Sequence, residues 1–266
     1  MSSDGHPLRR PTAPTPRSGA RTVSLVLTVR PGDGDPGRTL DRLLDQVPTG
    51  VQEVVLIGAP APRGGKREGP GGMDVRRLGT WDATRGDIPH AALLAATGDL
   101  IVLMNADGSM SPHEIPHYLH YLDSGYDFVK GSRFIAGGDC ADYPLSRRLG
   151  HRALLRVARR LYGQPLTDLW YGFCAFRRPF VELLDLHEDG VELGAELVAH
   201  ALHYGLRVAE VPSLELPRRH GPSHLRTIRD GTRILGTLVD ERPHNALSRL
   251  AHGPFRSNRG PHASRG

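Results

Sequence analysis

Four consecutive residues, Asn105-Ala106-Asp107-Gly108, directly follow the apolar stretch Leu100–Met104. A short run of Leu, Ile, Val and Met predicts a buried strand. Ligands of open parallel sheets bind at the carboxyl ends of the strands, where the Asp107 carboxylate could hold a divalent cation that bridges two phosphates. Asn-Ala-Asp-Gly is also an ordinary turn sequence, so these four residues alone leave both interpretations open.

Strand-like and helix-like patterns alternate along the middle of the chain. This alternation predicts a single α/β domain with a Rossmann-like, mostly parallel sheet flanked by helices. The predicted strands are Val23–Val29, Glu53–Ile57, Val75–Leu78, Leu100–Met104, Asp127–Lys130 and Arg207–Val211. The predicted helices are Arg38–Val47, His90–Ala96, Ser111–Leu122 with Ser111 as its N-cap, Leu149–Leu161, Gly194–Tyr204 and Leu225–Val239.

The two ends of the chain have a different composition from the middle. They are rich in Pro, Ser, Gly and Arg, a composition typical of segments without a packed core. Residues 1–20 and 243–266 are therefore predicted to be disordered tails, and residues 21–242 the α/β domain.

The overall composition restricts the classes of partner. No apolar run among the 266 residues is long enough to cross a bilayer, so any membrane contact is expected to be peripheral, at the inner face. Two cysteines are too few for a disulfide framework, which favours a cytoplasmic location. The formal charge is +5, but only 6% of the residues are aromatic, so nucleic acid is not an expected partner.

Four segments resemble, in order, the motifs of one enzyme family. They are TGDLIVLMNADGSMSPHEIP, KGSRF, LTDLWYGFCAFRR and GLRVAEVPSLELPRRHGPSHL. Their order and spacing resemble the family-2 inverting nucleotide-sugar glycosyltransferases of the dolichyl-phosphate-mannose-synthase type. The resemblance implies a glycosyltransferase A fold, a GDP- or UDP-sugar donor and Mn²⁺ or Mg²⁺ as cofactor. It also implies a polyprenyl phosphate, or a glycan or natural-product hydroxyl, as acceptor, in cell-envelope or polysaccharide biosynthesis.

The resemblance also implies roles for individual residues. Asp107 matches the second carboxylate of the metal-binding Asp-x-Asp and Asn105 stands in place of the first, so both are candidate donor and metal ligands. Arg133 matches an arginine near the acceptor, where a guanidinium suits a phosphate; the alternative is a structural salt bridge. Asp168 matches the carboxylate before the Gly-Phe turn. It is a candidate to orient the acceptor or take its proton, or else to cap a helix.

Two further candidates follow from the last motif. Arg218 and Ser223 match the family's Arg-x-x-Gly-x-Ser loop, a flexible segment suited to closing over phosphates. Glu196 stands where the family often carries a helical glutamate, and the apolar residues around it favour a structural role.

The chain departs from the family mainly in the donor half. Asn105 removes one formal charge from the metal site, and Gly-Ala-Pro at residues 58–60 replaces acids that help to hold the nucleoside. The family's Pro-Thr-x-Asn-Glu after the first strand is replaced by Thr-Val-Arg-Pro-Gly at residues 28–32. The usual Asn and Gly of the helix after the third strand appear as His90 and Ala92. The acceptor-side motifs are retained.

Two hypotheses follow. In the first, the chain is a working hexosyltransferase that inverts the anomeric carbon while a metal-bound nucleoside diphosphate leaves. A lipid phosphate acceptor, with a second pKa of about 6, would need little base catalysis, whereas a hydroxyl would need a base, for which Asp168 is the candidate. In the second, the chain is a catalytically silent relative that binds an acceptor or a partner protein. Mn²⁺-dependent nucleotide binding separates the two.

Overall fold

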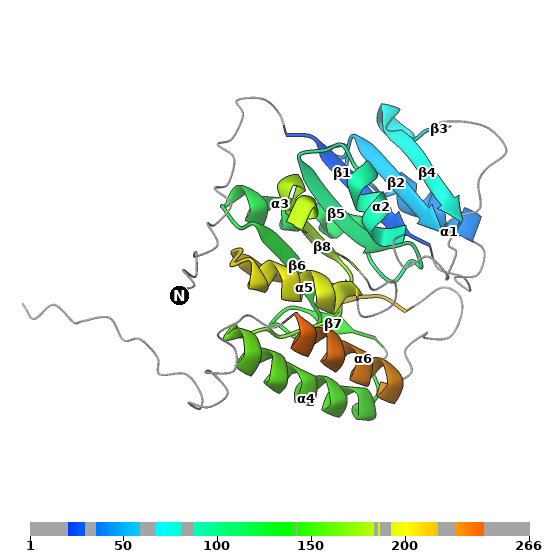
Figure 1. The fold of residues 1–266 in the computed structure, drawn as a ribbon. Coiled ribbons are helices and arrows are strands. Elements are labelled where there is room, and N and C mark those ends of the chain that lie inside the picture. The colour runs from blue at the N-terminus through cyan, green and yellow to red at the C-terminus, as the bar shows by residue number, and fades with distance from the viewer. Residues whose placement is uncertain are drawn as a thin grey trace, which may run out of the picture.

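An eight-stranded sheet forms the centre of the computed structural model, which describes residues 21–29, 36–58, 67–80, 88–141, 143–183, 186, 193–217 and 227–241. The strand order is β3-β4-β2-β1-β5-β8-β6-β9 (Figure 1). Strands β1, β2, β4 and β5 are parallel to one another, and β6 is parallel to β9. The prediction of a mostly parallel sheet is confirmed.

The elements have the following bounds. The sheet strands are β1 (Val23–Thr28), β2 (Glu53–Gly58), β3 (Arg67–Glu68), β4 (Asp74–Thr80), β5 (Leu100–Asn105), β6 (Phe128–Ser132), β8 (Cys174–Arg177) and β9 (Val208–Pro212). A separate two-stranded sheet joins β7 (Asp139–Cys140) to β10 (Leu214–Glu215). The helices are α1 (Pro36–Asp45), α2 (Ile88–Ala95), α3 (Ile115–Asp123), α4 (Leu145–Tyr162), α5 (Leu193–His203) and α6 (Thr227–Asp240).

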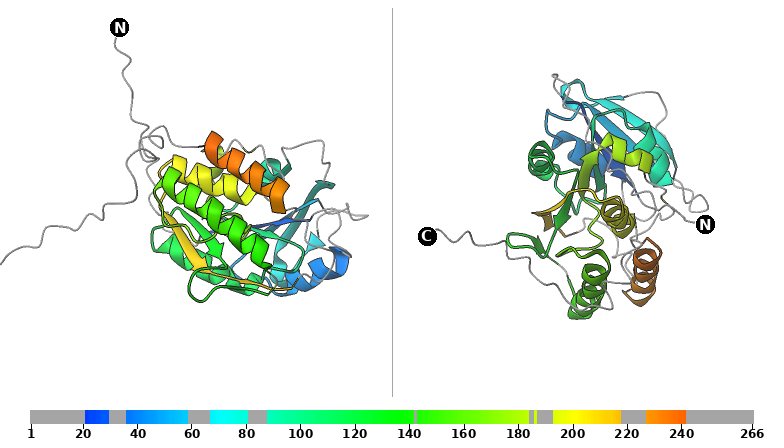
Figure 2. Two further views of the ribbon diagram at one scale, coloured as in Figure 1. Left: turned by 90° about the horizontal axis from the view of Figure 1, so that it is seen from below. Right: turned by 60° about the vertical axis from the view of Figure 1, so that its left-hand side comes forward.

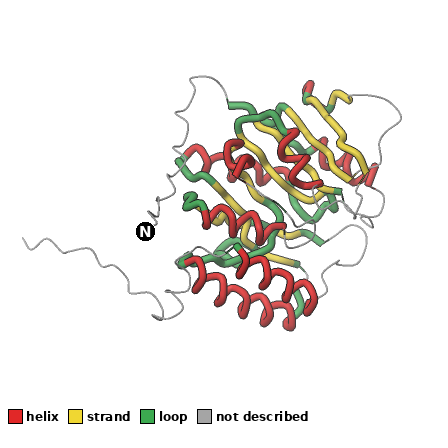
Figure 3. Tube along the Cα trace, viewed as in Figure 1, coloured by secondary structure: helices red, strands yellow, loops and turns green. Residues whose placement is uncertain are grey.

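The strands divide the core into two apolar layers because successive side chains point to opposite faces of a sheet. On β1, Val26 belongs to one layer, while Leu25 and Leu27 belong to the other, and all three are fully buried. Helices α2 and α5 cover the first face, and α1 and α3 cover the second (Figure 3). The predicted helices on both faces are thereby confirmed.

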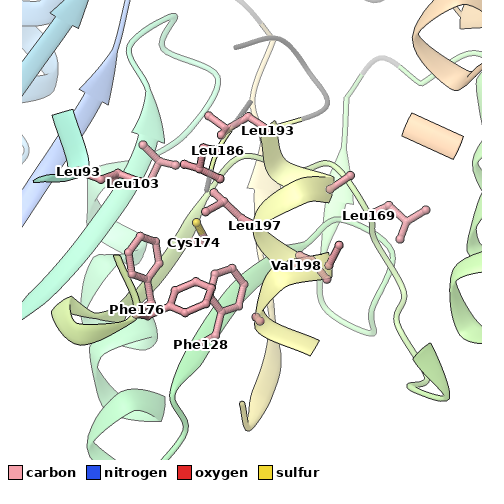
Figure 4. Close-up of a cluster of buried hydrophobic side chains, with 14 of the residues drawn as sticks. Leu93, Leu103, Phe128, Leu169, Cys174, Phe176, Leu186, Leu193, Leu197 and Val198 are labelled. Atoms are coloured by element: carbon pink, nitrogen blue, oxygen red, sulfur yellow. The ribbon is translucent and has the colours of Figure 1, made fainter. Parts of the chain in front are cut away.

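The first layer is densest where it supports β6 and β8. The rings of Phe128 and Phe176 stack with centroids 5.7 Å apart, and Leu197 and Val198 of α5 belong to the same cluster (Figure 4). Helices α4 and α6 pack beside α5, as the view from below shows (Figure 2). This packing fixes the ends of β6 and α4, from which the site residues project. None of the helices in the described ranges combines the length and apolar character that a membrane span requires.

The structure also corrects several expectations. Strand β8 was not predicted, and it lies antiparallel between β5 and β6. Helix α4 begins at Leu145 rather than Leu149. Ser111 takes the predicted N-cap position, but its side chain makes no capping hydrogen bond and the segment starts as a 3₁₀ turn rather than an α-helix. The Glu114 carboxylate instead accepts hydrogen bonds from Ser213, on the segment that enters β10, and from the Leu214 amide.

Candidate functional site

The carboxyl ends of β1 and β5 lie side by side and carry the first candidate ligand. Thr28 and Asn105 are register partners, and the Thr28 hydroxyl donates to Asn105 Oδ1 at 3.0 Å. A Cβ placed on Gly172 would lie 3.6 Å from the same oxygen. The Gly-Phe turn therefore runs directly past the Asn105 amide, a closeness that the sequence did not predict.

Asp107 forms the turn that its sequence allows. Its Oδ1 accepts hydrogen bonds from the Ser109 amide at 2.9 Å and the Ser109 hydroxyl at 2.6 Å. Gly108, with φ of 78°, takes the left-handed conformation that favours glycine. The Asp107 residue is only 5% exposed, so the turn holds its carboxylate in one orientation at the end of β5. The turn and ligand interpretations are compatible, because the turn is what orients the carboxylate.

The donor set at this edge consists of oxygen atoms, the type that Mg²⁺ and Mn²⁺ prefer. No cluster of three or more His, Cys, Asp or Glu side chains suitable for a metal ion occurs within the described ranges. A cation held by Asp107 and Asn105 would therefore take its remaining ligands from water or from substrate phosphates. Mg²⁺ is usually bound by one or two protein oxygen ligands together with substrate phosphates, so these residues fit such an ion.

The second candidate pair, Arg133 and Asp168, forms a buried ion pair. Arg133 Nε lies 2.7 Å from Asp168 Oδ2, and Nη2 lies 2.9 Å from Oδ1, which makes the pair bidentate. The Asp168 side chain is fully buried and that of Arg133 is 3% exposed. Arg133 Nη1 also donates to Glu215 at 2.8 Å. Three of the five guanidinium N–H groups are thus engaged by carboxylates.

This environment fixes the charge of Asp168. Burial alone would raise the pKa of the carboxyl group, but the charge and hydrogen bonds of Arg133, with the nearby Lys130, outweigh burial. The pKa of Asp168 is therefore held well below its usual range. A carboxylate with so low a pKa has little tendency to accept a proton at neutral pH.

A second layer of polar contacts anchors the Asp168 loop. Lys130 Nζ donates to the Asp168 carbonyl at 2.7 Å and lies 3.6 Å from Glu210 Oε1. The other oxygen of Glu210 accepts from the Thr167 amide and hydroxyl, at 2.7 and 2.8 Å. Lys130 is 1% exposed, so a buried cation and a nearly buried carboxylate on adjacent strands hold the loop in place.

Strand β10 connects the two halves of the site. Glu215 binds Arg133, and the next residue, Leu216, donates its amide to the Ser109 carbonyl at 2.9 Å. Ser109 is the residue that caps the Asp107 carboxylate. The Asp107 turn and the Arg133–Asp168 pair are therefore tied to two consecutive residues, the last of β10 and the one that follows it.

A cavity of about 480 Å³ opens beside the ion pair. It is lined by Arg133, Phe134, His151 and four of the six arginines of α4. His151 Nε2 lies 3.5 Å from Asp168 Oδ1, and its ring contacts Trp170 with centroids 4.3 Å apart. Burial lowers the pKa of His151 to about 4, and the Arg133 and Lys130 charges add to this effect although Asp168 opposes it. His151 is therefore an uncharged imidazole at neutral pH.

The predicted site residues have different outcomes. Asn105, Asp107, Arg133 and Asp168 converge on one region through β10 and the Gly-Phe turn. Arg218 and Ser223 lie outside the described residues, as do residues 30–32, 59 and 60. Glu196 is 1% exposed within α5.

The sequence did not predict the roles of four further residues, Lys130, His151, Glu210 and Glu215. Three of them lie inside the quoted motifs, as charged residues within otherwise apolar strand segments. That placement was an available signal for buried ion pairs. His151 lies in an arginine-rich helix, where nothing in the sequence distinguishes it from an exposed histidine.

Comparison with known proteins supports the motif resemblance. Residues 90–184 match the model of glycosyl transferase family 2. The chain is 32% identical over 129 residues to polyprenol monophosphomannose synthase of Mycolicibacterium smegmatis, covering 47% of this chain and 49% of that protein. It is 31% identical over 130 residues to undecaprenyl-phosphate mannosyltransferase of Micrococcus luteus, covering 48% and 53%. The chain thus spans about half the length of these two relatives.

Two longer matches extend the comparison. Dolichyl-phosphate hexose transferase of Haloferax volcanii is 28% identical over 196 residues, covering 74% of this chain and 83% of that protein. Among solved structures, glucosyl-3-phosphoglycerate synthase from Mycobacterium tuberculosis, in complex with Mn²⁺, UDP and glucosyl-3-phosphoglycerate, has a TM-score of 0.61 at 19% identity. That structural match covers 84% of this chain and 80% of that one, and it shows a shared fold.

Proposed function

Because residues 90–184 are a glycosyl transferase family 2 segment on a matching fold, we propose that the chain transfers a hexose from a GDP- or UDP-sugar to a phosphate-bearing acceptor. The transfer inverts the anomeric carbon. One observation carries the proposal: Glu215 of β10 and the adjacent Leu216 link the Arg133–Asp168 pair, the candidate acceptor side, to the Asp107 turn, the candidate donor side. A transferase needs both sides at one site, because the two substrates must meet in the geometry of attack.

On the donor side, Asp107 and Asn105 would hold Mn²⁺ or Mg²⁺. Such an ion, when bound, neutralises the diphosphate and makes it a better leaving group. The Asp107 turn keeps one carboxylate oriented at the end of β5, and Thr28 fixes the Asn105 amide. A metal with one carboxylate and one neutral oxygen ligand from the protein is expected to bind more weakly than one with two carboxylates.

On the acceptor side, the charge of Asp168 favours a phosphate over a hydroxyl. A hydroxyl acceptor needs a base, and a carboxylate that is paired with Arg133 and has a strongly lowered pKa is a poor one. A phosphate oxygen is already ionised and needs none. Asp168 is therefore a positioning residue, and its partner Arg133, which lines the cavity, keeps two N–H groups that no carboxylate engages in the described residues. Arg218 and Ser223 remain proposed phosphate contacts.

Polyprenyl phosphate is the proposed acceptor class. The names of three relatives refer to polyprenol, undecaprenyl phosphate and dolichyl phosphate, and this supports the proposal. The alternative is a catalytically silent relative that keeps the acceptor site without a working donor site. Its support is the loss of one carboxylate at Asn105 and the replacement of acids at residues 58–60.

Sugar transfer from radiolabelled GDP-mannose or UDP-glucose tests the proposal. With Mn²⁺ and a short polyprenyl phosphate, the label should move into an organic-extractable product. The matched control is the polyprenol alcohol of the same length, which should accept no label because it lacks the ionised oxygen. Transfer to the alcohol but not to the phosphate would contradict the proposed acceptor chemistry.

A further inference from the structure

Helix α4 carries a row of arginines along one face. Arg148, Arg152, Arg156 and Arg159 are spaced at helical intervals, and all four line the cavity of about 480 Å³. The helix contains no Asp or Glu anywhere along its 18 residues. Like charges four residues apart on a helix repel one another, so the row lowers the stability of α4 unless an anion compensates it.

The cavity provides little negative charge of its own for these arginines. Among the residues that the structure describes, Asp139 is the one carboxylate that lines it. Arg159 donates its Nε to the Leu166 carbonyl at 2.7 Å. Within the described ranges, no side-chain hydrogen bond or ion pair engages the guanidinium groups of Arg148, Arg152 or Arg156. A cavity with several unpaired guanidinium groups is suited to phosphate or carboxylate ligands, which accept two parallel hydrogen bonds from each arginine.

The length of the row indicates more than one anionic group. Eleven residues separate Arg148 from Arg159, which corresponds to about 16 Å along a helix. The oxygens of one phosphate lie too close together to contact guanidinium groups spread over that length. A ligand with two or more anionic groups could engage several of them at once.

We propose that this arginine cavity binds a ligand with at least two anionic groups, one of them a phosphate. Arg133 lines the same cavity, so a ligand there reaches the candidate acceptor site. Resting on the proposed function, this ligand would lie beside the acceptor phosphate and would be a separate molecule from a polyprenyl phosphate, which carries a single phosphate. The anion binding itself does not depend on transferase activity.

The source of the anion is either a free molecule or a lipid headgroup. Leu145 and Leu149, at the start of α4, are 76% and 67% exposed, and a lipid surface could receive them. Both sources share the same headgroup chemistry. Vesicle binding distinguishes a lipid headgroup from a free molecule.

The direct test is calorimetric titration of the full chain with pyrophosphate and with orthophosphate. Both titrations contain a metal chelator and have the same ionic strength, so that neither metal binding nor a difference in charge screening affects the comparison. Pyrophosphate should bind at least about tenfold more tightly than orthophosphate, because it engages more charge-assisted hydrogen bonds. The double variant Arg152→Ala/Arg156→Ala should lose that preference and at least about tenfold of its pyrophosphate affinity.

Arg160→Ala is the matched control. Arg160 is exposed on the same helix and does not line the cavity. Arg152 and Arg156 are exposed as well, so the control differs from them in its place outside the cavity. Removal of Arg160 should change pyrophosphate affinity by less than about twofold, since a charge outside the cavity acts only through screened attraction. An equal loss in Arg160→Ala and the double variant would overturn the proposal, because it would indicate net charge rather than a site. Equal wild-type affinity for the two anions, or none for either, would also overturn it.

Vesicle sedimentation separates the two sources. If lipid is the source, the wild type should bind to anionic phosphatidylglycerol vesicles but not to phosphatidylcholine vesicles. Added pyrophosphate should then release the protein from the phosphatidylglycerol vesicles. If the ligand is a free molecule, pyrophosphate binds and neither vesicle does. The cavity proposal would be overturned if pyrophosphate neither bound in the calorimeter nor released the protein from vesicles, because vesicle binding would then come from general surface attraction.

Mn²⁺-dependent nucleotide binding should be unchanged in the double variant. Absence of this nucleotide binding in the wild type would refute the proposed function but not the anion site.

Discussion

Arg133 and Asp168 meet through two parallel hydrogen bonds, 2.7 and 2.9 Å long, in a region almost closed to water. The pair joins the end of β6 to the loop before β8, and Glu215 adds a second carboxylate from β10. Arg133 therefore has a structural role whatever substrate it touches. The ion pairs confirm the salt-bridge interpretation from the sequence, whereas contact with the acceptor stays a prediction for the N–H groups that these pairs do not use.

Replacing Arg133 should destabilise the fold strongly. Arg133→Met leaves two carboxylates in a buried site without their cation, and breaking a buried pair typically costs about 3–5 kcal/mol. Urea unfolding should report this loss. The control is Arg207→Met, because Arg207 pairs with Asp127 at 3.4 Å with 61% of its side chain exposed. That change should cost about 0–1 kcal/mol. Equal losses in the two variants would contradict the buried-pair interpretation.

Asp168→Asn should lower transfer activity without changing the shape of its pH profile. The variant keeps the size of the side chain but weakens its hold on Arg133, so acceptor positioning suffers. The pKa of Asp168 lies well below neutrality, so its ionisation cannot set a rate change between about pH 6 and 8. The check is kcat/KM against pH for both proteins. An acid limb that the wild type shows and the variant lacks would identify Asp168 as a base after all.

The buried His151 should make the fold sensitive to mild acid. Its pKa falls from 6.5 to about 4 on folding, so the unfolded chain binds more protons between these values. Stability is therefore fully present above pH 6.5 and declines towards pH 4, by about 3 kcal/mol if this group acts alone. Asp168 adds a loss in the same direction, but only as the pH falls below about 4, near the usual carboxyl pKa.

Unfolding free energies of His151→Gln and of His113→Gln, measured between pH 7 and pH 4, test this prediction. His151→Gln removes the titrating group and should flatten the decline. His113 is exposed, so its variant should follow the wild type. A decline of the same size in His151→Gln as in the wild type would assign the acid sensitivity to other groups.

The sequence predicted the central parallel strands of the sheet better than the strand that pairs between them. The apolar stretches of β1 and β5 identified the central strands, because burial on both faces leaves a local pattern. Strand β8 has only four residues, and its antiparallel place between β5 and β6 depends on contacts distant in sequence. No local pattern records such a pairing.

The candidate site, too, depends on contacts between residues that are distant in sequence. Motif resemblance identified Arg133 and Asp168 as separate candidates, but not that one fixes the charge of the other across 35 positions of sequence. Asp168 was therefore a candidate base until burial and pairing were known. Residue type indicates which chemistry is available at a position, whereas its partners decide the protonation state.

The measurement that most directly tests the proposed transferase is Mn²⁺-dependent binding of GDP and UDP to the wild type, Asp107→Ala and Asn105→Asp. Weak binding is expected in the wild type, since Asp107 is the one carboxylate of the candidate metal pair. Asp107→Ala should abolish it. Asn105→Asp should tighten it, because a second carboxylate restores a charge beside the cation. No detectable binding in the wild type, unrescued by Asn105→Asp, would contradict the transferase and leave a catalytically silent relative.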